Sequence, residues 1–440
     1  MRKAATPGVL VLAAMVVLWP SSCGCPGPGG DDAGDGGGDG GAVDAGLIWP
    51  NGQSSANSDP WLVANHQLIG QLQPKVLVVN FVNGFTDAQV TRKFSDVARA
   101  YREATRYHAT VDPEAIPFIE FQLARVVNLR DNPVPSGYQF ENSTRYPRTS
   151  TTAPFTWMDY GAFFSAAFAS HYGYSNDAGG HYTLCELIDR GLVNELWFIG
   201  SGDVPDSAAY ESLESKQRYN VSHNKLDGSF DRCAGNGCFD VSVPVCNRSV
   251  RIAFINYNRG GGCFLESLGH SFEGMANNGS LPWLRPYFRE FGGFDLDTRY
   301  GVPFNSWYAC STPGCVTYSN VTATGMSAAW SVGAQTGTIA SYLPACGNAH
   351  FPPNGRQHYD ITNPQSVPST CAHYRMRDAP DGGDLIDTYS GNTVAGFFTL
   401  APDCTGAWEV YWRQSFPGRQ NLARDDAGQP MLNWWPFLYY

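Results

Sequence analysis

Residues 263–275 have the sequence CFLESLGHSFEGM and follow a β-branched apolar run and three glycines. At 100° per residue, Glu266, His270 and Glu273 fall on one stripe of a helix, and most apolar side chains fall on the other side. A carboxylate and an imidazole one turn apart can reach the same cation, and both are Zn²⁺ ligands. The stretch therefore predicts a helix with an apolar back and a metal-binding front.

An ordinary surface helix has the same pattern and is the alternative. Glu266 and Glu273 would then be solvated carboxylates, and His270 would only be hydrogen-bonded to Glu266. A further ligand from the second half of the chain that lies close to Glu266 and His270 would favour the metal-binding helix over the surface helix. We expect this ligand to be His350, because the two prolines that follow it stiffen the loop; the competing candidates are His358 and His373.

The first 22 residues predict an export signal, because two basic residues precede an apolar run that is too short to span a membrane. Ser21 and Ser22 before Cys23 resemble a lipoprotein processing site, and a plain secretory signal is the alternative. Residues 23–46 are rich in Gly and Asp and predict a flexible acidic tether. We therefore expect a cell-envelope lipoprotein bound to the membrane by a lipid on Cys23, or otherwise a secreted protein.

Charge and cysteine content limit the partners and the compartment. The formal net charge is −11, and no cluster of Lys and Arg is present that would neutralise phosphates, so nucleic acid is not an expected partner. Ten of the 12 cysteines follow the signal region, which predicts up to five disulfides. Cys233 with Cys238 and Cys310 with Cys315 would form the easiest local loops. We expect Cys263 to be disulfide-bonded rather than a ligand, and the protein to be a monomer.

Short apolar runs alternate with one strongly helical pattern in the first half of the globular part. Strands are predicted at 75–82, 116–129, 195–200 and 250–257, and helices at 87–104 and 183–192. This order predicts an α+β fold in which residues 47–278 form a mixed β-sheet with helices and place the site where strands end. Residues 279–440 predict a loop-rich, aromatic, disulfide-stapled lobe of the same domain.

Residues 269–276, GHSFEGMA, resemble the zinc-binding helix of secreted IgA-peptidase-type metallopeptidases, whose pattern is HELGHSFGGLA. On that pattern His270 matches the second zinc histidine, Glu266 replaces the first, and Ser267 replaces the catalytic glutamate. Residues 83–96, NGFTDAQVTRKFSD, are similar to the GYT segment and helix that open the same family. The resemblance implies a zincin-like fold and a site for zinc or another divalent metal.

More of the chain resembles a group of uncharacterised secreted proteins of bacteria and fungi. The shared signals are the ELW strand at Glu195, the NYNRGGG segment at 256–262, the helix at 263–275, the CGNAHFPPN segment at 346–354 and the NWW segment at Asn433. No activity is associated with that group, so this resemblance supports a fold more than a reaction.

Ordinary zincin proteolysis needs a base that Ser267 cannot provide, because an unassisted hydroxyl is too weak a base at neutral pH. We therefore expect a divergent, peptidase-like metal-dependent hydrolase acting on a cell-envelope or extracellular peptide or polysaccharide. Glu273 would serve as the base or as a further ligand. The alternative is a non-catalytic envelope lipoprotein that binds polysaccharide or protein through its aromatic lobe.

A second polar group follows the third predicted strand, where Asp203 is expected to share a rim with Arg259 and Glu266. We predict catalytic roles for Asp203 and Arg259. Paired carboxylates such as Asp203 and Glu266 could also act on a glycosidic bond without metal, although turn and N-cap roles are ordinary for such residues. The glycines at 260–262 would either hold an anion at the helix N-terminus or only permit a tight turn.

Overall fold

The structure is a computed structural model that describes residues 46–52, 61, 64–82, 84–107, 114–129, 160–200, 215–216, 246, 250–277, 281–377 and 383–439. Ala45–Tyr440 form one compact unit, and Met1–Asp44 form a separate unit that lies outside the described residues. The expected export signal, the lipid-bearing Cys23 and nearly all of the tether therefore also lie outside them.

The centre of the fold is a five-stranded sheet with the order β4-β3-β5-β7-β6. Its strands are β3 (Lys75–Asn80), β4 (Gln122–Asn128), β5 (Glu195–Gly200), β6 (Ser215–Lys216) and β7 (Arg251–Asn256). Neighbouring strands from β4 to β7 are parallel, and β6 pairs with β7 antiparallel at the edge. The sheet is mixed, and the α+β class predicted from the sequence agrees with it.

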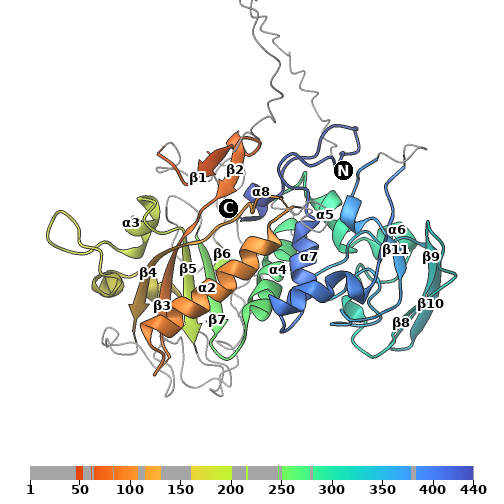
Figure 1. Cartoon of the computed structure of the whole chain (residues 1–440), viewed down its shortest axis with the longest axis horizontal. Helices are drawn as coiled ribbons and strands as arrows, with labels where there is room; N and C mark the ends of the chain where they lie inside the picture. The colour runs from red at the N-terminus through yellow and green to blue at the C-terminus, as the bar shows by residue number, and fades with distance from the viewer. Residues whose placement is uncertain are drawn as a thin grey trace, which may run out of the picture. The chain divides into compact units, whose positions relative to one another are not determined.

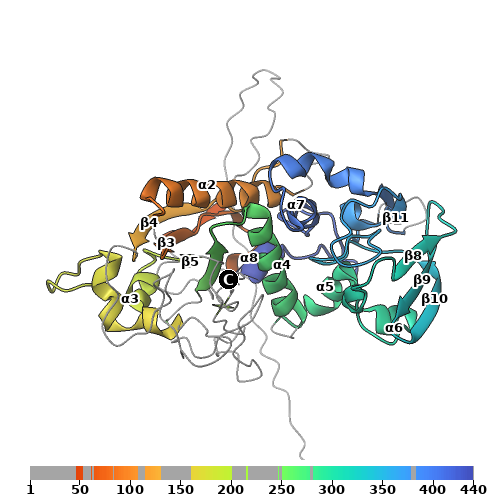
Figure 2. The same cartoon turned by 90° about the horizontal axis from the view of Figure 1, so that it is seen from below.

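Both faces of this sheet are covered, which explains the continuous apolar runs of its central strands. In β3, Val76 and Val78 pack into one core, while Leu77 and Val79 pack into another. Helix α2 (Asp87–Ala104) covers the first face, and α3 (Leu184–Asp189) with the 3-10 turns η1 (Tyr160–Phe164) and η2 (Ala166–Tyr172) covers the second (Figure 2).

Helix boundaries in this half follow from capping chemistry. Thr86 accepts a hydrogen bond from the backbone of Gln89, whose side chain returns to the Thr86 backbone, so α2 opens with a complete capping box. Thr183 and Glu186 do the same for α3. Strand β4 starts later than predicted, at Gln122, because the residues before it form only isolated bridges, one of them at Pro117.

The second half contributes more regular structure than expected. It contains α4 (Gly261–Asn277), α5 (Arg285–Gly292), α6 (Leu296–Tyr300), η4 (Trp307–Ala309), β8 (Val316–Ser319), β9 (Met326–Val332), β10 (Gln335–Tyr342), β11 (Val367–Ser369), η5 (Cys371–His373), β12 (Asp387–Tyr389), η6 (Gly391–Thr399), α7 (Gly406–Gln414) and α8 (Trp435–Tyr439). Strands β8, β9 and β10 form an antiparallel sheet, β11 pairs with β12, and β1 (Leu47–Trp49) pairs with β2 (Ile69–Leu72).

Helices α2, α4 and α7 lie side by side, so the two halves of the chain share one core (Figure 1). Residues from Trp49 to Leu438 belong to the same apolar cluster. The tryptophans of the last segment are fully buried in it, namely Trp408, Trp412, Trp434 and Trp435. These four side chains stabilise the core and are not available for stacking on a sugar.

Three disulfides join cysteines among the described residues: Cys185–Cys246, Cys263–Cys404 and Cys346–Cys371. They point to an extracellular or otherwise oxidising location. Cys263 is disulfide-bonded as predicted. The predicted Cys310–Cys315 loop is wrong, because both residues are buried thiols that contact each other without a disulfide. Cys233 and Cys238 lie outside the described residues.

Candidate metal centre

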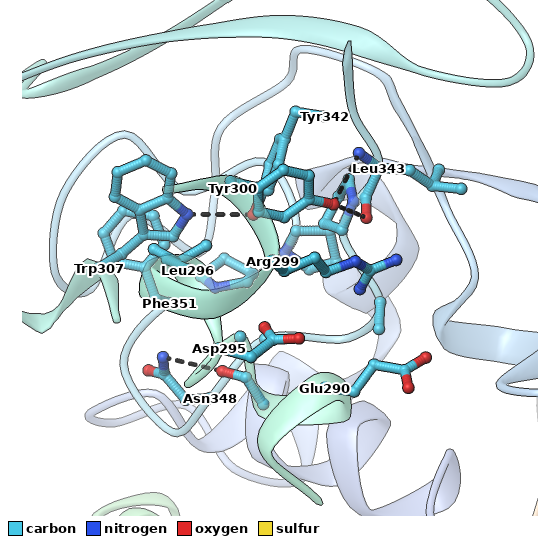
Figure 3. Close-up of a pocket in the computed structure, with 17 residues that line it drawn as sticks. Glu290, Asp295, Leu296, Arg299, Tyr300, Trp307, Tyr342, Leu343, Asn348 and Phe351 are labelled. Carbon is cyan, nitrogen blue, oxygen red and sulfur yellow. Dashed lines mark hydrogen bonds between the residues drawn. The ribbon is translucent and has the colours of Figure 1, made fainter. Parts of the chain in front are cut away.

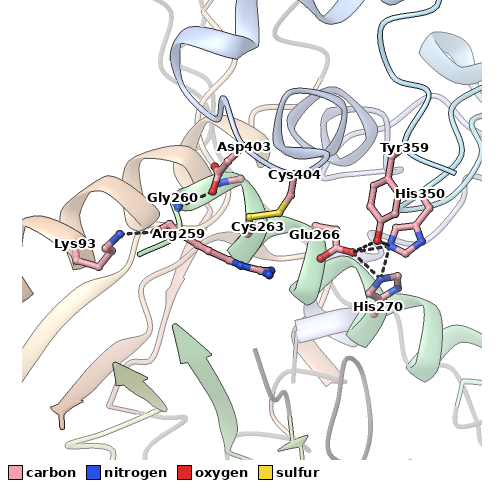
Figure 4. The surroundings of a disulfide bond; sticks show 11 residues. Lys93, Arg259, Gly260, Cys263, Glu266, His270, His350, Tyr359, Asp403 and Cys404 are labelled. Carbon is pink, nitrogen blue, oxygen red and sulfur yellow. Dashed lines mark hydrogen bonds and ion pairs between the residues drawn. A yellow bond between two sulfur atoms is a disulfide. The ribbon is translucent and has the colours of Figure 1, made fainter. Parts of the chain in front are cut away.

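Helix α4 begins directly after the exit of β7, and its N-terminus is capped by a side chain from far along the chain. The Asp403 carboxylate accepts hydrogen bonds from the backbone amides of Gly260, at 2.5 Å, and Gly262, at 2.9 Å. Cys404, the next residue, forms the disulfide with Cys263 (Figure 4). The amides of these glycines therefore hold an internal carboxylate, which fills the position that an external anion would have taken as one of the two alternatives.

The glycines at this end of α4 are required by close backbone contact. A Cβ at Gly262 would lie 2.2 Å from the Asp403 carbonyl oxygen, and a Cβ at Gly406 would lie 2.4 Å from the Gly262 Cα. The N-termini of α4 and α7 thus touch through backbone atoms. This contact, the cap and the disulfide fix the position of α4 and of the side chains that it presents.

Three potential ligands from two segments converge in front of α4 (Figure 4). Nε2 of His270 lies 3.1 Å from Oε1 of Glu266 and 3.0 Å from Nε2 of His350. Nε2 of His350 lies 2.5 Å from the same Glu266 oxygen. Glu266, His270 and His350 therefore form a group that could hold a metal ion, with two imidazoles and one carboxylate as donors. These are the three residues predicted as metal ligands from the sequence.

The polar stripe of α4 does not face open solvent. Glu266 is 6 % exposed and Glu273 is 7 % exposed, so neither is a solvated surface carboxylate. Burying charged groups is costly unless they are paired or bind a cation. This burial disagrees with the alternative of an ordinary surface helix, in which both carboxylates would be solvated.

Glu273 has a different place from the predicted one. Its Oε2 lies 2.6 Å from Nδ1 of His270, on the side of the ring opposite to the donor group. Both of its oxygens lie 2.7 Å from the Tyr308 hydroxyl, and the Ala349 amide donates to Oε1 at 2.8 Å. Glu273 therefore supports the imidazole from behind, and this position does not suit the base or the further ligand that we expected.

A carboxylate behind a histidine selects the tautomer that suits a metal ligand. With the Nδ1 proton donated to Glu273, Nε2 is the nitrogen of His270 that can offer a lone pair to a metal ion once it has lost its proton, and it lies beside Glu266 and His350. His350 is held differently, because its Nδ1 is buried without a hydrogen-bond partner among the described residues. Its ring instead packs between Tyr308 and Tyr359, with ring centroids 5.4 Å and 4.2 Å away.

The protonation states follow from burial and close contacts. Burial by itself raises the pKa of Glu266, but hydrogen bonds from His270 and His350 outweigh it and lower that pKa to about 2. Burial also opposes the ionisation of Glu273, yet His270 and Tyr308 lower its pKa. For His270, burial lowers the pKa, but the two carboxylates raise it well above the ordinary value. The protonated His270 ring therefore donates one N–H to each carboxylate, and a divalent cation could replace the proton on Nε2, on the side of Glu266.

Glu409 and Arg413 of α7 form a buried ion pair behind the site, and this pair was not predicted from the sequence. A Cβ at Gly269 would lie 2.9 Å from Oε2 of Glu409, so this glycine lets the carboxylate approach α4. Burial raises the pKa of Glu409 to about 8, and the nearby Glu273 and Glu266 add to this although Arg413 opposes it. Nη2 of Arg413 donates to the Leu265 carbonyl at 2.5 Å and ties α7 to the site helix. In the sequence, this ion pair is indicated only by the i,i+4 spacing of Glu409 and Arg413.

Of the two remaining predicted residues, only Arg259 is described by the structure. Asp203 lies outside the described residues. Arg259 is half-buried at the N-terminal side of α4, where its carbonyl accepts a hydrogen bond from Lys93 Nζ (Figure 4). The hydrogen bonds that described residues give to Glu266 come from His270, His350 and Tyr359, so a role for Arg259 stays a prediction.

A second group with metal-ligand spacing, Cys263, Asp403 and Cys404, lies at the N-terminus of α4. Its two sulfurs form a disulfide with each other, so neither is a thiolate. The Asp403 oxygens are already bonded to backbone amides. This group is a structural clamp.

A pocket in the second half is lined by charged and aromatic residues that include Glu290, Asp295 and Arg299 (Figure 3). Several of its polar groups bond to one another or to the backbone: Trp307 Nε1 donates to the Tyr342 hydroxyl at 3.0 Å, and the Tyr300 hydroxyl donates to the Leu343 carbonyl at 3.1 Å. None of the three donor residues lines this pocket. Among the described residues, no group of His, Cys, Asp and Glu with metal-ligand spacing is found at this pocket.

Comparison of the chain with protein-family models, with curated proteins and with solved structures finds no match. Among the described residues, no helix combines the length and the hydropathy that crossing a membrane requires.

Proposed function

We propose that the protein is a metal-dependent, peptidase-like hydrolase of zincin-like fold, whose ion is held by Glu266, His270 and His350. The observation that carries the proposal is the convergence of two imidazoles and one carboxylate from segments 84 residues apart. Two histidines and a glutamate are a donor set of catalytic zinc sites, where a fourth position stays open. A divalent ion bound there would polarise a substrate carbonyl as a Lewis acid.

The surroundings of the donors support a metal more than a simple hydrogen-bonded cluster. His270 is oriented by Glu273, which is itself held by Tyr308 and Ala349. Such layered support of a ligating histidine is typical of metal sites. The mixed sheet and the helix that follows its last parallel strand agree with the zincin-like arrangement that the sequence resemblance implies.

The proposal includes export to the cell envelope, with a lipid on Cys23 as the membrane anchor and an envelope or extracellular peptide or polysaccharide as substrate. The disulfides among the described residues support an oxidising compartment. A non-catalytic binding protein is the second candidate, because Ser267 replaces the usual base and is only 4 % exposed. Such a binding protein would bind the metal ion but would not catalyse hydrolysis.

Metal analysis of the purified mature protein tests the proposal. We expect one equivalent of zinc or another divalent transition metal, lost in His270→Ala and in His350→Ala and retained in the control His181→Ala, whose ring is exposed. A wild-type protein without stoichiometric metal, or a His270→Ala variant that keeps it, would refute the metal centre. Chelator-sensitive cleavage of labelled casein favours the hydrolase, whereas bound metal without cleavage of casein or of cell-wall material favours the binding protein.

A further inference from the structure

Tyr359 reaches the donor group from the turn that follows His350. Its hydroxyl lies 2.9 Å from Nε2 of His350 and 3.5 Å from Oε1 of Glu266. The first distance falls within the range of those between the donors themselves, 2.5 to 3.1 Å, and the second is slightly longer. The Tyr359 oxygen therefore belongs to the same cluster of atoms.

The distances fit one coordination polyhedron. Four N or O donors placed tetrahedrally around Zn²⁺ at its usual bond length lie about 3.3 Å from one another. The five known separations among Glu266, His270, His350 and the Tyr359 hydroxyl range from 2.5 to 3.5 Å. The phenol oxygen thus lies near enough to Glu266 and His350 to share one ion with them.

The backbone at Tyr359 is built to hold this position. Its φ is +63°, in the left-handed region that is unfavourable for any residue with a Cβ. The Tyr359 amide donates to the His350 carbonyl at 2.9 Å, so the turn is tied to the ligand that it covers. Asp360 closes the turn by accepting from the backbone and the guanidinium of Arg356, at 3.1, 2.7 and 3.2 Å. Strained backbone held by such contacts is common at functional sites.

Exposure distinguishes Tyr359 from the other phenol near the site. Tyr359 is 52 % exposed, whereas the side chains of Glu266, His270 and His350 are 8 to 13 % exposed. Tyr308 is directed to Glu273 instead, at 2.7 Å from both of its oxygens. Tyr359 therefore lies on the solvent side of the donors, where an incoming substrate would meet it first.

We propose that Tyr359 is the fourth ligand of the metal centre, bound as a phenolate and displaced when substrate enters. This inference rests on the proposed function, because it requires the metal. On ligation the Tyr359 O–H bond breaks, its proton passes to solvent water, and the oxygen forms a bond to the ion. The positive charge of the ion favours this ionisation, as it does for other bound protic groups.

Copper provides a readout that does not depend on activity. Cu²⁺ is added to the metal-free mature protein at about pH 8, because metal ligands must be deprotonated to bind. A phenolate bound to Cu²⁺ gives a charge-transfer band in visible light. We expect one equivalent of Cu²⁺ and this band in the wild type, and the same stoichiometry without the band in Tyr359→Phe. Phenylalanine keeps the ring and its packing on His350.

The controls separate this inference from the metal site itself. Tyr300→Phe removes a phenol that is bonded to the Leu343 carbonyl, and it should keep the band. A band that persists in Tyr359→Phe, or a copper-loaded wild type without a band, would overturn the role of Tyr359 and leave the three-donor site intact. A wild type that binds no metal would overturn both. Circular dichroism checks that each variant is folded.

Discussion

Replacing Glu273 with glutamine should weaken metal binding although Glu273 does not reach the donor group. The carboxylate accepts hydrogen bonds from three groups, namely Nδ1 of His270 at 2.6 Å, the Tyr308 hydroxyl at 2.7 Å and the Ala349 amide at 2.8 Å. Glutamine has the same shape but only one acceptor oxygen. If that oxygen serves Tyr308 and Ala349, the amide NH₂ faces His270.

An NH₂ group at that position needs an acceptor, so it favours the His270 tautomer with its proton on Nε2. That proton points at the ion position and blocks ligation. Loss of a carboxylate behind a ligating histidine typically costs about 10- to 100-fold in metal affinity, or about 1.4–2.8 kcal/mol. The lost charge-assisted bond also removes about 1.5–3 kcal/mol from the free energy of unfolding of the metal-free protein.

Zinc affinity is measured by competition with a chromophoric chelator, and stability by urea unfolding in the presence of EDTA. Asp177→Asn is the matched control, since it replaces an exposed carboxylate with an amide, and it should leave both quantities unchanged. If Glu273→Gln binds zinc as tightly as the wild type, Glu273 does not orient His270 and the support described for this ring is incorrect.

Zinc affinity should rise with pH, because the carboxylates raise the pKa of His270 well above its usual value of about 6.5 and the ion must displace that proton. Below this pKa, affinity should fall about tenfold per pH unit for one released proton, and a flat profile from chelator competition would show that His270 is not a ligand. Gly262→Ala should lower the free energy of unfolding by about 1–3 kcal/mol in urea titrations, because its Cβ meets the Asp403 backbone, whereas Gly396→Ala, with open space around it, should have little effect. Arg413→Met should cost about 3–5 kcal/mol by leaving Glu409 buried and unpaired, and adding Glu409→Leu should restore most of this in the same assay; a double variant as unstable as the single one would contradict the account.

The sheet and its first helix could be predicted from the sequence because their patterns are local. The runs at β3, β5 and β7 are apolar on both faces, and α2 carries a clear amphipathic period with a capping box. Helix α7 could not be predicted in this way. All nine of its residues are buried, including Glu409 and Arg413, so it shows no contrast between an apolar and a polar face.

The donor group could be predicted from the sequence, because Glu266 and His270 share a helix face and the prolines after His350 indicate a rigid loop. The role of Glu273 could not be predicted. Helical spacing shows on which face of the helix a residue lies, but not which ring nitrogen of His270 it contacts. Asp403 and Tyr359 carried no local signal. Asp403 is 141 residues from Gly262, and Tyr359 is 93 residues from Glu266. Contacts over such separations depend on the folded chain and cannot be predicted from a periodic pattern.

The clamp of Asp403 and Cys404 on α4 also sets the order in which the protein can mature. The helix that bears two of the donors depends on a cap and a disulfide partner 141 residues downstream, and the third donor lies between them in sequence. Contacts so distant in sequence form only after a large loop has closed. A chain that is only partly folded therefore has the ligands but not their arrangement. Metal would be acquired only after residues 403–414 have docked, in the compartment where the cysteines have already been oxidised.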